Sequence, residues 1–529
     1  MRDFQRPGRS EVHGFRSMVA TSHPLASLAA LDALREGGNA IDGAIAAAAV
    51  LAVVEPSQTG IGGDCFALLK KPGHAVVAMN GSGWAPRGAS ATLLAERGID
   101  QIEPGTPEAV TVPGAVRAWS RLANDYGRLE WERLLAPAIM LAERGYAVSP
   151  RLARDWSRQI GKLSRHPACR EIFLPQGRSP AAGERHVQLA LARTLKAIAQ
   201  EGADCFYEGW IADDIVQTLA QMDGVHAPDD FASWTPAYEQ PISRKYRGYE
   251  LWECRPNGQG VTALQMAMLL DGELRGKYEA MSVQRFHFLA EVARAAYADR
   301  DALVADPAST GEIADKLLAR DRIQAIASHI DMSKRNDEWA LPCPTPEHRD
   351  TTYISVVDED RFAVSLINSI FDDFGSGIVA ARSGVLLHNR GCGFSVANDH
   401  PNVIRGRKRP LHTIIPALLT RDNETAMSFG VTGGHFQPMG QMLLLSNVLD
   451  CGMTIQEAID FPRIFARGVD LELEHTVSVV VMDGLARLGH TPRWAENPIG
   501  TAQAIWLDHD GGGLVGAADS RRDGIALGI

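Results

Sequence analysis

Two apolar segments near the start of the chain have the spacing of helices. Residues 26–38 read ASLAALDALREGG, in which leucines recur every three residues and a Gly-Gly pair suits a helix C-terminus. Residues 40–54 read AIDGAIAAAAVLAVV and are apolar nearly all round, which predicts a buried helix that ends before Pro56. The glycines of TGIGG, residues 59–63, then predict a turn before a strand that begins near Cys65.

A mainly helical middle region is followed by a loop and then by short strands. Residues 110–330 are rich in Ala, Leu and Arg and predict a mainly helical region, with strand-like stretches such as YELWEC at 249–254. Residues 332–350 contain three prolines and charges of both signs without a period, which predicts an exposed loop. Short strands follow, with one clear helix at residues 438–449.

The boundary between the exposed loop and the strands falls within EHRDTTYISVVDED, residues 347–360. Residues 351–357 alternate as a strand does, residues 358–361 fit a four-residue hairpin loop, and residues 362–368 continue as the partner strand. If Val357 pairs with Phe362, Thr351 lies within about one residue of Ser369. The pattern therefore places two hydroxyl groups at one strand tip, beside an exposed loop.

A threonine that follows a cleaved peptide bond can act as a catalyst. Its hydroxyl is a poor nucleophile until a base takes the proton, and its own α-amino group, with an unperturbed pKa of about 8, is the nearest base. The boundary at Thr351 is therefore interpreted as a self-cleavage site. A strand that begins with threonine only because threonine favours strands is the alternative.

A second candidate feature is a glycine pair between a strand and a helix. Residues 429–449 read FGVTGGHFQPMGQMLLLSNVL, in which Gly433 and Gly434 precede the predicted helix. Glycines here let backbone N–H groups converge near a helix N-terminus, which suits a developing oxyanion. A tight turn without a catalytic role is the alternative, and the glycines of FGSG (374–377) fit close packing equally well.

Composition indicates an ordinary globular protein. The 529 residues are 45% hydrophobic and 22% charged, and the net charge of −11 is spread along the chain. The one dense basic run, at residues 405–409, is interpreted as a solvated loop, so we expect no nucleic-acid partner. The opening residues lack the apolar core of a secretory signal and no segment is suited to a membrane span, so a cytoplasmic location without a membrane partner is expected.

Cysteine spacing and short motifs favour chemistry without a cofactor. The seven cysteines are odd in number, widely spaced and free of any C-x-x-C motif, which argues against a disulfide framework and a structural zinc site. We therefore expect no metal and no organic cofactor. GQGVTA, residues 258–263, is similar to a dinucleotide-binding fingerprint, but no second βαβ unit follows it. A nucleotide-dependent oxidoreductase is thus a remote alternative.

Motifs along nearly the whole chain resemble the gamma-glutamyltranspeptidase family of N-terminal-nucleophile hydrolases. The similar stretches are MVATSHPLAS (18–27), GGNAIDGAIAAAAVLAVVEP (37–56), TGIGGDCFALL (59–69), TVPGAVRAW (111–119), RPNGQG (255–260), DTTYISVVDED (350–360), FGSGIV (374–379), VTGGH (431–435) and GAADSRRDGIALG (516–528). The resemblance implies an α+β fold, a four-layer αββα sandwich. It also implies cleavage between Asp350 and Thr351 into a large subunit (1–350) and a small subunit (351–529) that share one core.

The resemblance also assigns roles at the cleavage site. It implies that Thr351 is the nucleophile, with its free amine as the base, and that Ser369 is the second hydroxyl beside it. Gly433 and Gly434 match the donors to the oxyanion. Thr352 is disfavoured as the nucleophile because the family motif begins at the first threonine of the pair.

The family's glutamyl-binding residues are mostly absent from this chain. The family's arginine for the substrate α-carboxylate falls near Ser82, and its Asp-Asp pair is replaced by Cys392-Gly393. The family's Ser-Ser pair corresponds to His412-Thr413, and an asparagine becomes Phe371. Each lost partner would leave a substrate group unpaired at a cost of about 1–3 kcal/mol, so glutathione is expected to be a poor substrate.

Cationic and aromatic residues stand in the motifs that border the nucleophile in the family. They are Trp84, His388, Arg390, His412 and His435, and Thr413 lies beside one of them. An arginine can hold a carboxylate through two parallel hydrogen bonds, which predicts a small amide that bears a carboxylate as substrate. Alternatively, Arg390 pairs with Asp372 or Asp373, and each histidine is structural.

Among relatives without the glutamyl determinants, the chain is most similar to the oxamate amidohydrolase branch. The similarity lies in HNRGCGF (388–394) and RPLHTIIP (409–416). It implies release of ammonia from oxamate in purine-ring breakdown, with the small amide and the two subunits of the precursor as partners; whether the processed protein forms larger oligomers stays open. Gamma-glutamyl transfer or glutathione hydrolysis is the first alternative, and a non-catalytic scaffold is another.

Overall fold

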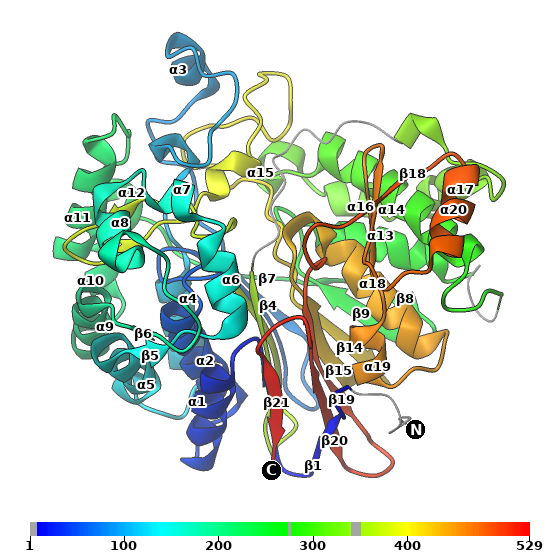
Figure 1. Ribbon diagram of the computed structural model, residues 1–529, viewed down its shortest axis with the longest axis horizontal. Coiled ribbons are helices and arrows are strands. Elements are labelled where there is room, and N and C mark those ends of the chain that lie inside the picture. Colours follow the sequence, from blue (N-terminus) through cyan, green and yellow to red (C-terminus); the bar gives the residue numbers. More distant parts are fainter. Residues whose placement is uncertain (1–7, 273–276, 340–350) are drawn as a thin grey trace.

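Two sheets lie face to face at the centre of the computed structural model, which describes residues 8–272, 277–339 and 351–529. Helices cover the outer face of each sheet, as Figure 1 shows. The first sheet has the strand order β1 (Val12–Gly14), β20 (Leu514–Ala518), β19 (Ala502–Leu507), β15 (Glu424–Val431), β14 (Ala417–Arg421), β9 (Tyr249–Glu253), β8 (Ile242–Tyr246). The second has the order β21 (Ile525–Gly528), β2 (Met18–Thr21), β10 (Thr352–Val357), β11 (Ala363–Ser369), β3 (Asp64–Lys70), β4 (Val77–Gly81), β7 (Ala237–Glu239).

Three apolar layers hold the four structural layers together. One fills the space between the sheets, with Phe66, Tyr353 and Leu418 among its members. The second sheet packs outward against α1 (Pro24–Arg35), α2 (Ala40–Val54) and α4 (Ala115–Tyr126), and α5 (Trp131–Arg144) and α9 (Leu189–Glu201) lie beyond them. The first sheet packs outward against α13 (Gly260–Leu270) and α18 (Gln437–Leu449), and α14 (Val283–Leu303) packs against these two helices. The predicted αββα sandwich is confirmed.

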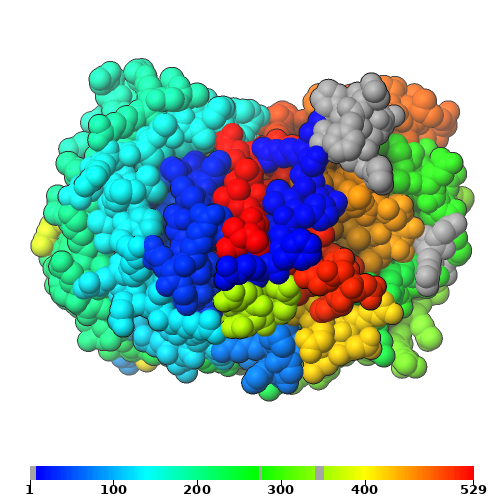
Figure 2. All heavy atoms as spheres, turned by 90° about the horizontal axis from the view of Figure 1, so that it is seen from below, coloured from blue at the N-terminus to red at the C-terminus, as the bar shows by residue number. Residues whose placement is uncertain are grey.

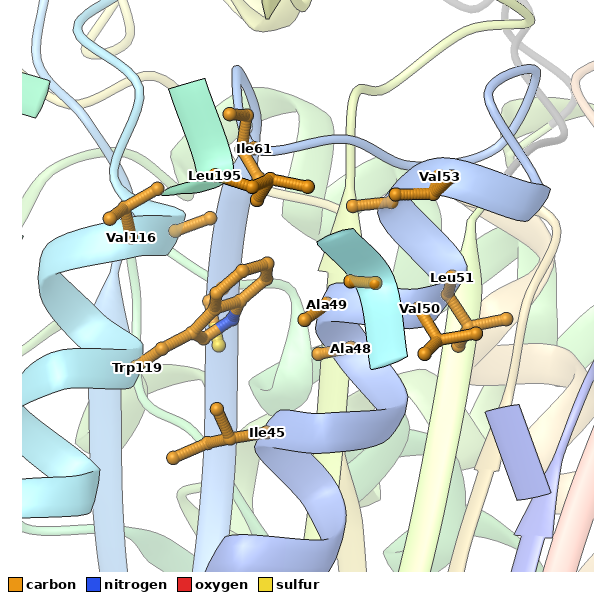
Figure 3. Packing of buried hydrophobic residues seen from close by; sticks show 14 of the residues in the cluster. Ile45, Ala48, Ala49, Val50, Leu51, Val53, Ile61, Val116, Trp119 and Leu195 are labelled. Carbon is orange, nitrogen blue, oxygen red and sulfur yellow. The ribbon is translucent and has the colours of Figure 1, made fainter. Parts of the chain in front are cut away.

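Helix α2 is buried over its whole length, as its all-round apolar sequence predicts. Asn39 caps its first turn by accepting hydrogen bonds from the N–H groups of residues 41 and 42, and the Asp42 carboxylate accepts from the Asn39 N–H. Small side chains let neighbours approach closely: the ring of Trp119 lies beside Ile45, Ala48 and Ala49 in Figure 3. This helix supports strands β10 and β11 from behind.

The hairpin differs from its predicted register by one residue. Val357 pairs with Ala363, not with Phe362, so the loop has five residues, 358–362, where four were expected. The carboxylate of Asp358 explains the extra residue, because it accepts hydrogen bonds from the N–H groups of Asp360 and Phe362 and from Ala40 at the start of α2. Thr352 consequently pairs with Asn368, which places Thr351 level with Ser369.

Segments from both sides of residue 350 contribute to each sheet. β10 lies between β2 and β11, and β11 pairs with β3 on its other side. At the opposite end of the sheet, β21 pairs with β2, and Figure 2 shows this red C-terminal strand between blue N-terminal residues. Neither the part before residue 350 nor the part after it contains either of the two seven-stranded sheets in full.

The remaining elements surround this frame. The other helices are α3 (Ala91–Glu96), α6 (Pro150–Ser157), α7 (Ile160–Leu163), α8 (Pro167–Phe173), α10 (Asp204–Tyr207), α11 (Trp210–Ala220), α12 (Pro228–Ala232), α15 (Pro307–Thr310), α16 (Ile313–Leu317), α17 (Arg320–Ser328), α19 (Ile455–Asp460) and α20 (Val479–Arg487). The other strands are β5 (Tyr146–Ala147), β6 (Arg185–His186), β12 (Val379–Ala380), β13 (Val385–Leu386), β16 (Ile464–Arg467), β17 (Asp470–Leu473) and β18 (Thr491–Trp494). Within the described ranges, no helix combines the length and the apolar character needed to cross a bilayer.

The strand before the fingerprint-like GQGVTA segment has the wrong neighbours for a dinucleotide fold. β9 runs antiparallel to both β8 and β14, and helix α13 follows it directly. A dinucleotide-binding βαβ unit requires parallel strands joined by the helix. The oxidoreductase alternative therefore finds no support in the fold.

Candidate active site

Thr351 lies fully buried at the tip of β10, on the face that looks toward the other sheet. Its Oγ1 is 3.1 Å from Ser369 Oγ, and its backbone N–H donates to Gln58 Oε1 at 3.2 Å. Thr352 points to the opposite face, where its Oγ1 donates to the Asn368 carbonyl at 3.0 Å. The structure thus brings together the predicted pair of hydroxyls. The cleavage prediction also involves Asp350, which lies outside the described residues.

Because strand β10 packs face to face with strand β15, Thr351 lies toward the glycine turn. On β10, the ring of Tyr353 covers Gly430 of β15 so closely that a Cβ there would lie 2.3 Å from the ring. Two residues further along β10, Ser355 Oγ donates to Ser428 Oγ at 2.7 Å. The two strands therefore run in opposite directions where they pack against each other across the sandwich. Extending this pairing by two residues places Thr351 opposite Thr432, which precedes Gly433.

Gly433 and Gly434 form a turn between β15 and α18, and their N–H groups are the feature that matters for the site. Gly433 has φ +108° and Gly434 has φ +58°, conformations that only glycine adopts readily. A 3-10 turn, η5 (Gly434–Phe436), follows and leads into the N-terminus of α18. Among the described residues, no acceptor is within hydrogen-bond reach of the Gly433 or Gly434 N–H. Two such donors beside a helix N-terminus are suited to a developing negative charge.

A buried carboxylate, Asp64, organises the other side of the site. It pairs with Ser369 across the β3–β11 ladder, so both side chains lie on the same sheet face. Its Oδ1 accepts the N–H groups of Gly83 and Gly114, at 3.1 and 3.2 Å. Its Oδ2 accepts a hydrogen bond from His412 Nε2 at 2.9 Å, and His388 Nδ1 is 3.6 Å from the same oxygen.

Burial and neighbouring charges set the protonation states of this cluster. Burial alone raises the pKa of Asp64, but His388, His412 and Arg390 together outweigh it and hold that pKa below its ordinary value. Burial, assisted by the positive charge of Arg390, lowers the pKa of His412 to about 3, and burial also lowers the pKa of His388. At neutral pH the site therefore contains an aspartate anion and two neutral imidazoles.

Arg390 supplies the positive charge of the site from a fully buried position. Its Nη1 donates to Thr413 Oγ1 at 2.8 Å, and its guanidinium lies 4.3 Å from the ring centre of Phe371. Within the described chain, its Nε and Nη2 have no hydrogen-bond partner. The alternative ion pairs do not form: Asp372 accepts from Lys162 at 2.8 Å and Asp373 accepts from Gln58 at 3.1 Å.

Phe371 connects the arginine to the hydroxyl pair. Its backbone N–H donates to Ser369 Oγ at 3.0 Å while its ring lies against Arg390. Its φ of +80° is unusual for a residue with a bulky side chain. The asparagine expected at this position from the family pattern would tolerate that conformation more easily. Strain of this kind is found preferentially at functional sites.

Two other predicted residues have different surroundings. The Trp84 indole donates to the Asp230 carbonyl at 3.1 Å and lies beneath Arg407, so its side chain is directed at α12. His435 is buried within the η5 turn, and its carbonyl accepts from Tyr297. The structure thus gathers Ser369, His388, Arg390, His412 and Thr413 around Thr351, and turns Trp84 away from them.

Three buried polar residues of the site were missed from the sequence. Gln58 and Asp64 lie within SQTGIGGDCFALL, where the glycines predicted only a turn. Gln259 lies within the fingerprint-like segment. All three are completely buried. Polar side chains in such apolar, glycine-rich surroundings are a usable signal, because a buried polar group needs a specific partner.

A cavity of about 230 Å³ is lined by Thr432, the residue before the glycine turn. Asp373, which accepts from Gln58, lines one side, and Thr432 and Gly500 line the other. Arg154 and Arg158 form part of its outer wall. Gln58 donates to Asp373 and accepts from the Thr351 N–H, so a single side chain connects the cavity wall with Thr351.

One buried group in the described ranges has metal-ligand geometry. The ligand atoms of His287, Glu291 and His490 all lie within 4.8 Å of one another. Arg294 Nη1, however, is 2.9 Å from His490 Nδ1 and 3.2 Å from Glu291 Oε1. A guanidinium in that position repels a cation, so we assign no metal to this group. The six described cysteines, all but Cys343, are free thiols.

Comparisons with known proteins agree on one family. Residues 26–529 match the model of the family described as gamma-glutamyltranspeptidase. The glutathione hydrolase-like YwrD proenzyme of Bacillus subtilis is 35% identical, over 98% of this chain and 99% of the relative. The oxamate amidohydrolase proenzyme of Klebsiella pneumoniae is 34% identical, over 97% of this chain and 98% of the relative.

A solved structure extends the similarity to three dimensions. The crystal structure of cephalosporin acylase from Bacillus halodurans superposes with a TM-score of 0.93 and 36% sequence identity. The superposition covers 100% of this chain and 99% of the acylase. The similar proteins thus share the whole fold but are named for different amide substrates.

Proposed function

The chain belongs to the gamma-glutamyltranspeptidase family of N-terminal-nucleophile hydrolases, and from this premise we propose that it is a self-processing amidohydrolase with Thr351 as nucleophile. Its substrate is a small amide that bears a carboxylate, such as oxamate, and its products are ammonia and the acid. The observation that carries the proposal is the buried Arg390, which has two unused donor atoms and contacts the ring of Phe371, the residue whose N–H donates to Ser369 of the hydroxyl pair.

Self-cleavage exposes the catalytic amine. Thr351 Oγ1 attacks the carbonyl carbon of Asp350, the C–N bond to Thr351 breaks, and the nitrogen takes the proton that the hydroxyl loses. Water then hydrolyses the resulting ester, which returns the hydroxyl to Thr351 and leaves a carboxylate on Asp350. The large subunit (1–350) and small subunit (351–529) remain as two chains.

Turnover repeats this chemistry on an external amide. The free amine of Thr351 takes the hydroxyl proton while Oγ1 attacks the amide carbonyl, and the N–H groups of Gly433 and Gly434 stabilise the oxyanion. The proton passes to the leaving nitrogen, and ammonia departs. Water then attacks the acyl ester and releases the acid. Ser369 Oγ and Gln58 Oε1 orient the hydroxyl and the amine respectively.

The proposed specificity follows from short connections within the site. The guanidinium of Arg390 contacts the ring of Phe371, whose N–H meets Ser369, so little room separates the cation from the nucleophile. A carboxylate on the carbon next to the amide fits such a spacing. The Asp64 anion keeps His412 in place without placing a second cation in the site. Resemblance to an oxamate amidohydrolase supports the same substrate class.

Gamma-glutamyl transfer is the competing function, favoured by the glutathione hydrolases among the relatives. The test compares ammonia release from oxamate with chromophore release from a gamma-glutamyl anilide, using matured enzyme. We expect oxamate turnover and little anilide turnover. Rapid anilide cleavage with inert oxamate would reverse the assignment.

The nucleophile is tested with two neighbouring threonines. Thr351→Ala is expected to remain one chain and to be inactive, whereas Thr352→Ala, whose hydroxyl faces away from the site, is expected to be cleaved and active. Intact mass measurement and ammonia release give the two readouts. Cleavage or turnover by Thr351→Ala would refute the assignment.

A further inference from the structure

One side chain, that of Gln259, connects the glycine turn with the segment at Thr413 that supports Arg390. This segment is called the carboxylate-binding arm below. Gln259 lies in RPNGQG, the segment similar to a nucleotide fingerprint, immediately before helix α13. Its Nε2 donates to the Gly434 carbonyl at 2.9 Å and to the Thr413 carbonyl at 2.7 Å. The side chain is completely buried.

The orientation of the amide is fixed by a cation. Arg300 Nη1 donates to Gln259 Oε1 at 2.7 Å, and Arg300 is itself 1% exposed. A guanidinium has only donors, so the amide oxygen must face it and the NH₂ group must face the two carbonyls. The reversed amide would place donors against a donor and an oxygen against two oxygens.

On one side, the hydrogen bond from Gln259 holds the turn that exposes the Gly433 and Gly434 N–H groups. The Gly433 carbonyl accepts from Phe436 N–H, the Gly434 carbonyl accepts from Gln259, and the His435 carbonyl accepts from Tyr297. In a peptide plane the carbonyl of one residue and the N–H of the next point in opposite directions. The contact with Phe436 therefore fixes the Gly434 N–H directly, and the contact with Gln259 fixes the following plane and so holds Gly434 from its C-terminal side. Of these supports, only Gln259 also reaches Thr413.

On its other side, Gln259 holds the arm that supports Arg390. Thr413 Oγ1 accepts from Arg390 Nη1, while its carbonyl accepts from Gln259. The backbone reinforces this contact, because Gln259 N–H donates to the His412 carbonyl and His412 N–H donates to the Asn257 carbonyl. One amide group therefore sets the distance between the carboxylate-binding cation and the oxyanion donors.

We propose that Gln259 is a positioning residue that couples the oxyanion turn to the carboxylate-binding arm of the proposed amidohydrolase site. This inference rests on the proposed function for the roles of Arg390 and the glycine N–H groups. Gln259 does not touch the reacting atoms, but its loss would misplace both groups that do. A misplacement of about 1 Å lowers turnover by about 10²-fold.

Helix α13, which Gln259 precedes, contains a matched control. Gln265 is also buried, and its Nε2 donates to Asp299 and to the Leu317 carbonyl, away from the site. We expect Gln259→Met and Gln265→Met to lower the melting temperature to a similar extent. Only Gln259→Met is expected to lower kcat, by about 10²-fold, and to raise the KM for oxamate by about 10-fold.

Further readouts separate positioning from a loss of folded protein. Active-site titration removes any effect of misfolded material, and a rise in KM for oxamate but not for its methyl ester traces the defect to the carboxylate arm. Gln259→Glu keeps the size and the contact with Arg300 but has no donors, so it should match Gln259→Met. An active Gln259→Glu, or equal kinetics in Gln259→Met and Gln265→Met, would overturn the inference.

A sulfonyl fluoride serves as a probe independent of the substrate. Its reaction with Thr351 also develops negative charge on an oxygen at the glycine turn, so Gln259→Met should slow inactivation by about 10²-fold relative to Gln265→Met. If wild-type enzyme reacts with the probe but not with oxamate, the proposed substrate fails while this comparison still decides the role of Gln259. Equal inactivation rates of the two variants would refute that role.

Discussion

At the scale of single residues, the site combines one anion and one cation that never meet as an ion pair. Asp64 has its acceptor sites filled by two backbone N–H groups and His412, and Arg390 donates to a neutral hydroxyl. A buried charge without a full set of partners is costly to fold, and such a cost is retained where a ligand completes the set. The unused donors of Arg390 are therefore the clearest functional feature at this scale.

Ser369→Ala tests the hydroxyl pair. Removing Ser369 Oγ takes away the group 3.1 Å from Thr351 Oγ1, the proposed nucleophile, and the acceptor of the Phe371 N–H, so we expect kcat to fall by about 10²-fold. Ser365→Ala is the control, because Ser365 lies on the same face of β11 but contacts Tyr353 and Ala417. Steady-state ammonia release measures both variants. Equal kcat values would remove Ser369 from the mechanism.

At the scale of elements, the contact between the two sheets sets the position of Thr351 relative to the glycine turn. Gly430→Ala would place a methyl group 2.3 Å from the ring of Tyr353 and push β10 and β15 apart. We expect a loss of about 1–3 kcal/mol in unfolding free energy and slower self-cleavage, because Thr351 would move relative to Gly433. Urea denaturation and the rate of chain cleavage are the measurements.

Gly161→Ala provides the control for that substitution. Gly161 lies in α7 and has no atom within 4 Å of its added Cβ, so we expect a change of about 0.5 kcal/mol or less. A similar loss in both variants would mean that glycine content, and not sheet spacing, accounts for the effect of Gly430→Ala.

A buried histidine between elements predicts the acid sensitivity of the fold. His186 of β6 packs against Tyr146, Trp156 and Phe173, and burial lowers its pKa from 6.5 to about 4. Below pH 6.5 the unfolded chain therefore binds a proton that the folded protein does not, and stability falls as the pH is lowered toward 4. This group accounts for about 3 kcal/mol of that loss.

His186→Phe should remove this contribution. The difference in unfolding free energy between pH 7 and pH 4, measured by urea denaturation, is expected to shrink by about 3 kcal/mol relative to wild type. The exposed His329→Phe serves as the control and should leave the difference unchanged. An unchanged difference in His186→Phe would show that another group controls acid unfolding.

At the scale of the whole molecule, the sheets predict how the processed protein behaves. β10 and β11 lie between β2 and β3, and β14 and β15 lie between β9 and β19, so each sheet contains strands from both proposed subunits. Separating the subunits would expose the apolar layer between the two sheets to water. The cleaved protein should therefore elute as one species with the mass of the uncut chain and separate only in denaturant. Dissociation in native buffer would contradict this expectation.

The sequence by itself determined the local elements and the motifs on which the proposed nucleophile rests. The Asn39 cap and the apolar run after it determine helix α2, and the alternation of residues 351–369 determines the β10–β11 hairpin, apart from one residue of register. Thr351, Ser369 and the glycine pair were recognisable because motif and local pattern coincide. Local hydrogen bonding and side-chain periodicity act over a few residues, so they can be recognised from the sequence alone.

Only the tertiary structure decided which distant residues complete the site. Nothing in the local sequence relates Asp64 to His412, Gln58 to Thr351, or Gln259 to both Gly434 and Thr413, because sheet pairing and sheet stacking create these contacts. The same holds for Arg390, because Asp372 and Asp373, its alternative partners, accept hydrogen bonds from Lys162 and Gln58 instead. A buried polar group is satisfied by whichever partner the packed fold brings within about 3 Å, and that partner is set by topology.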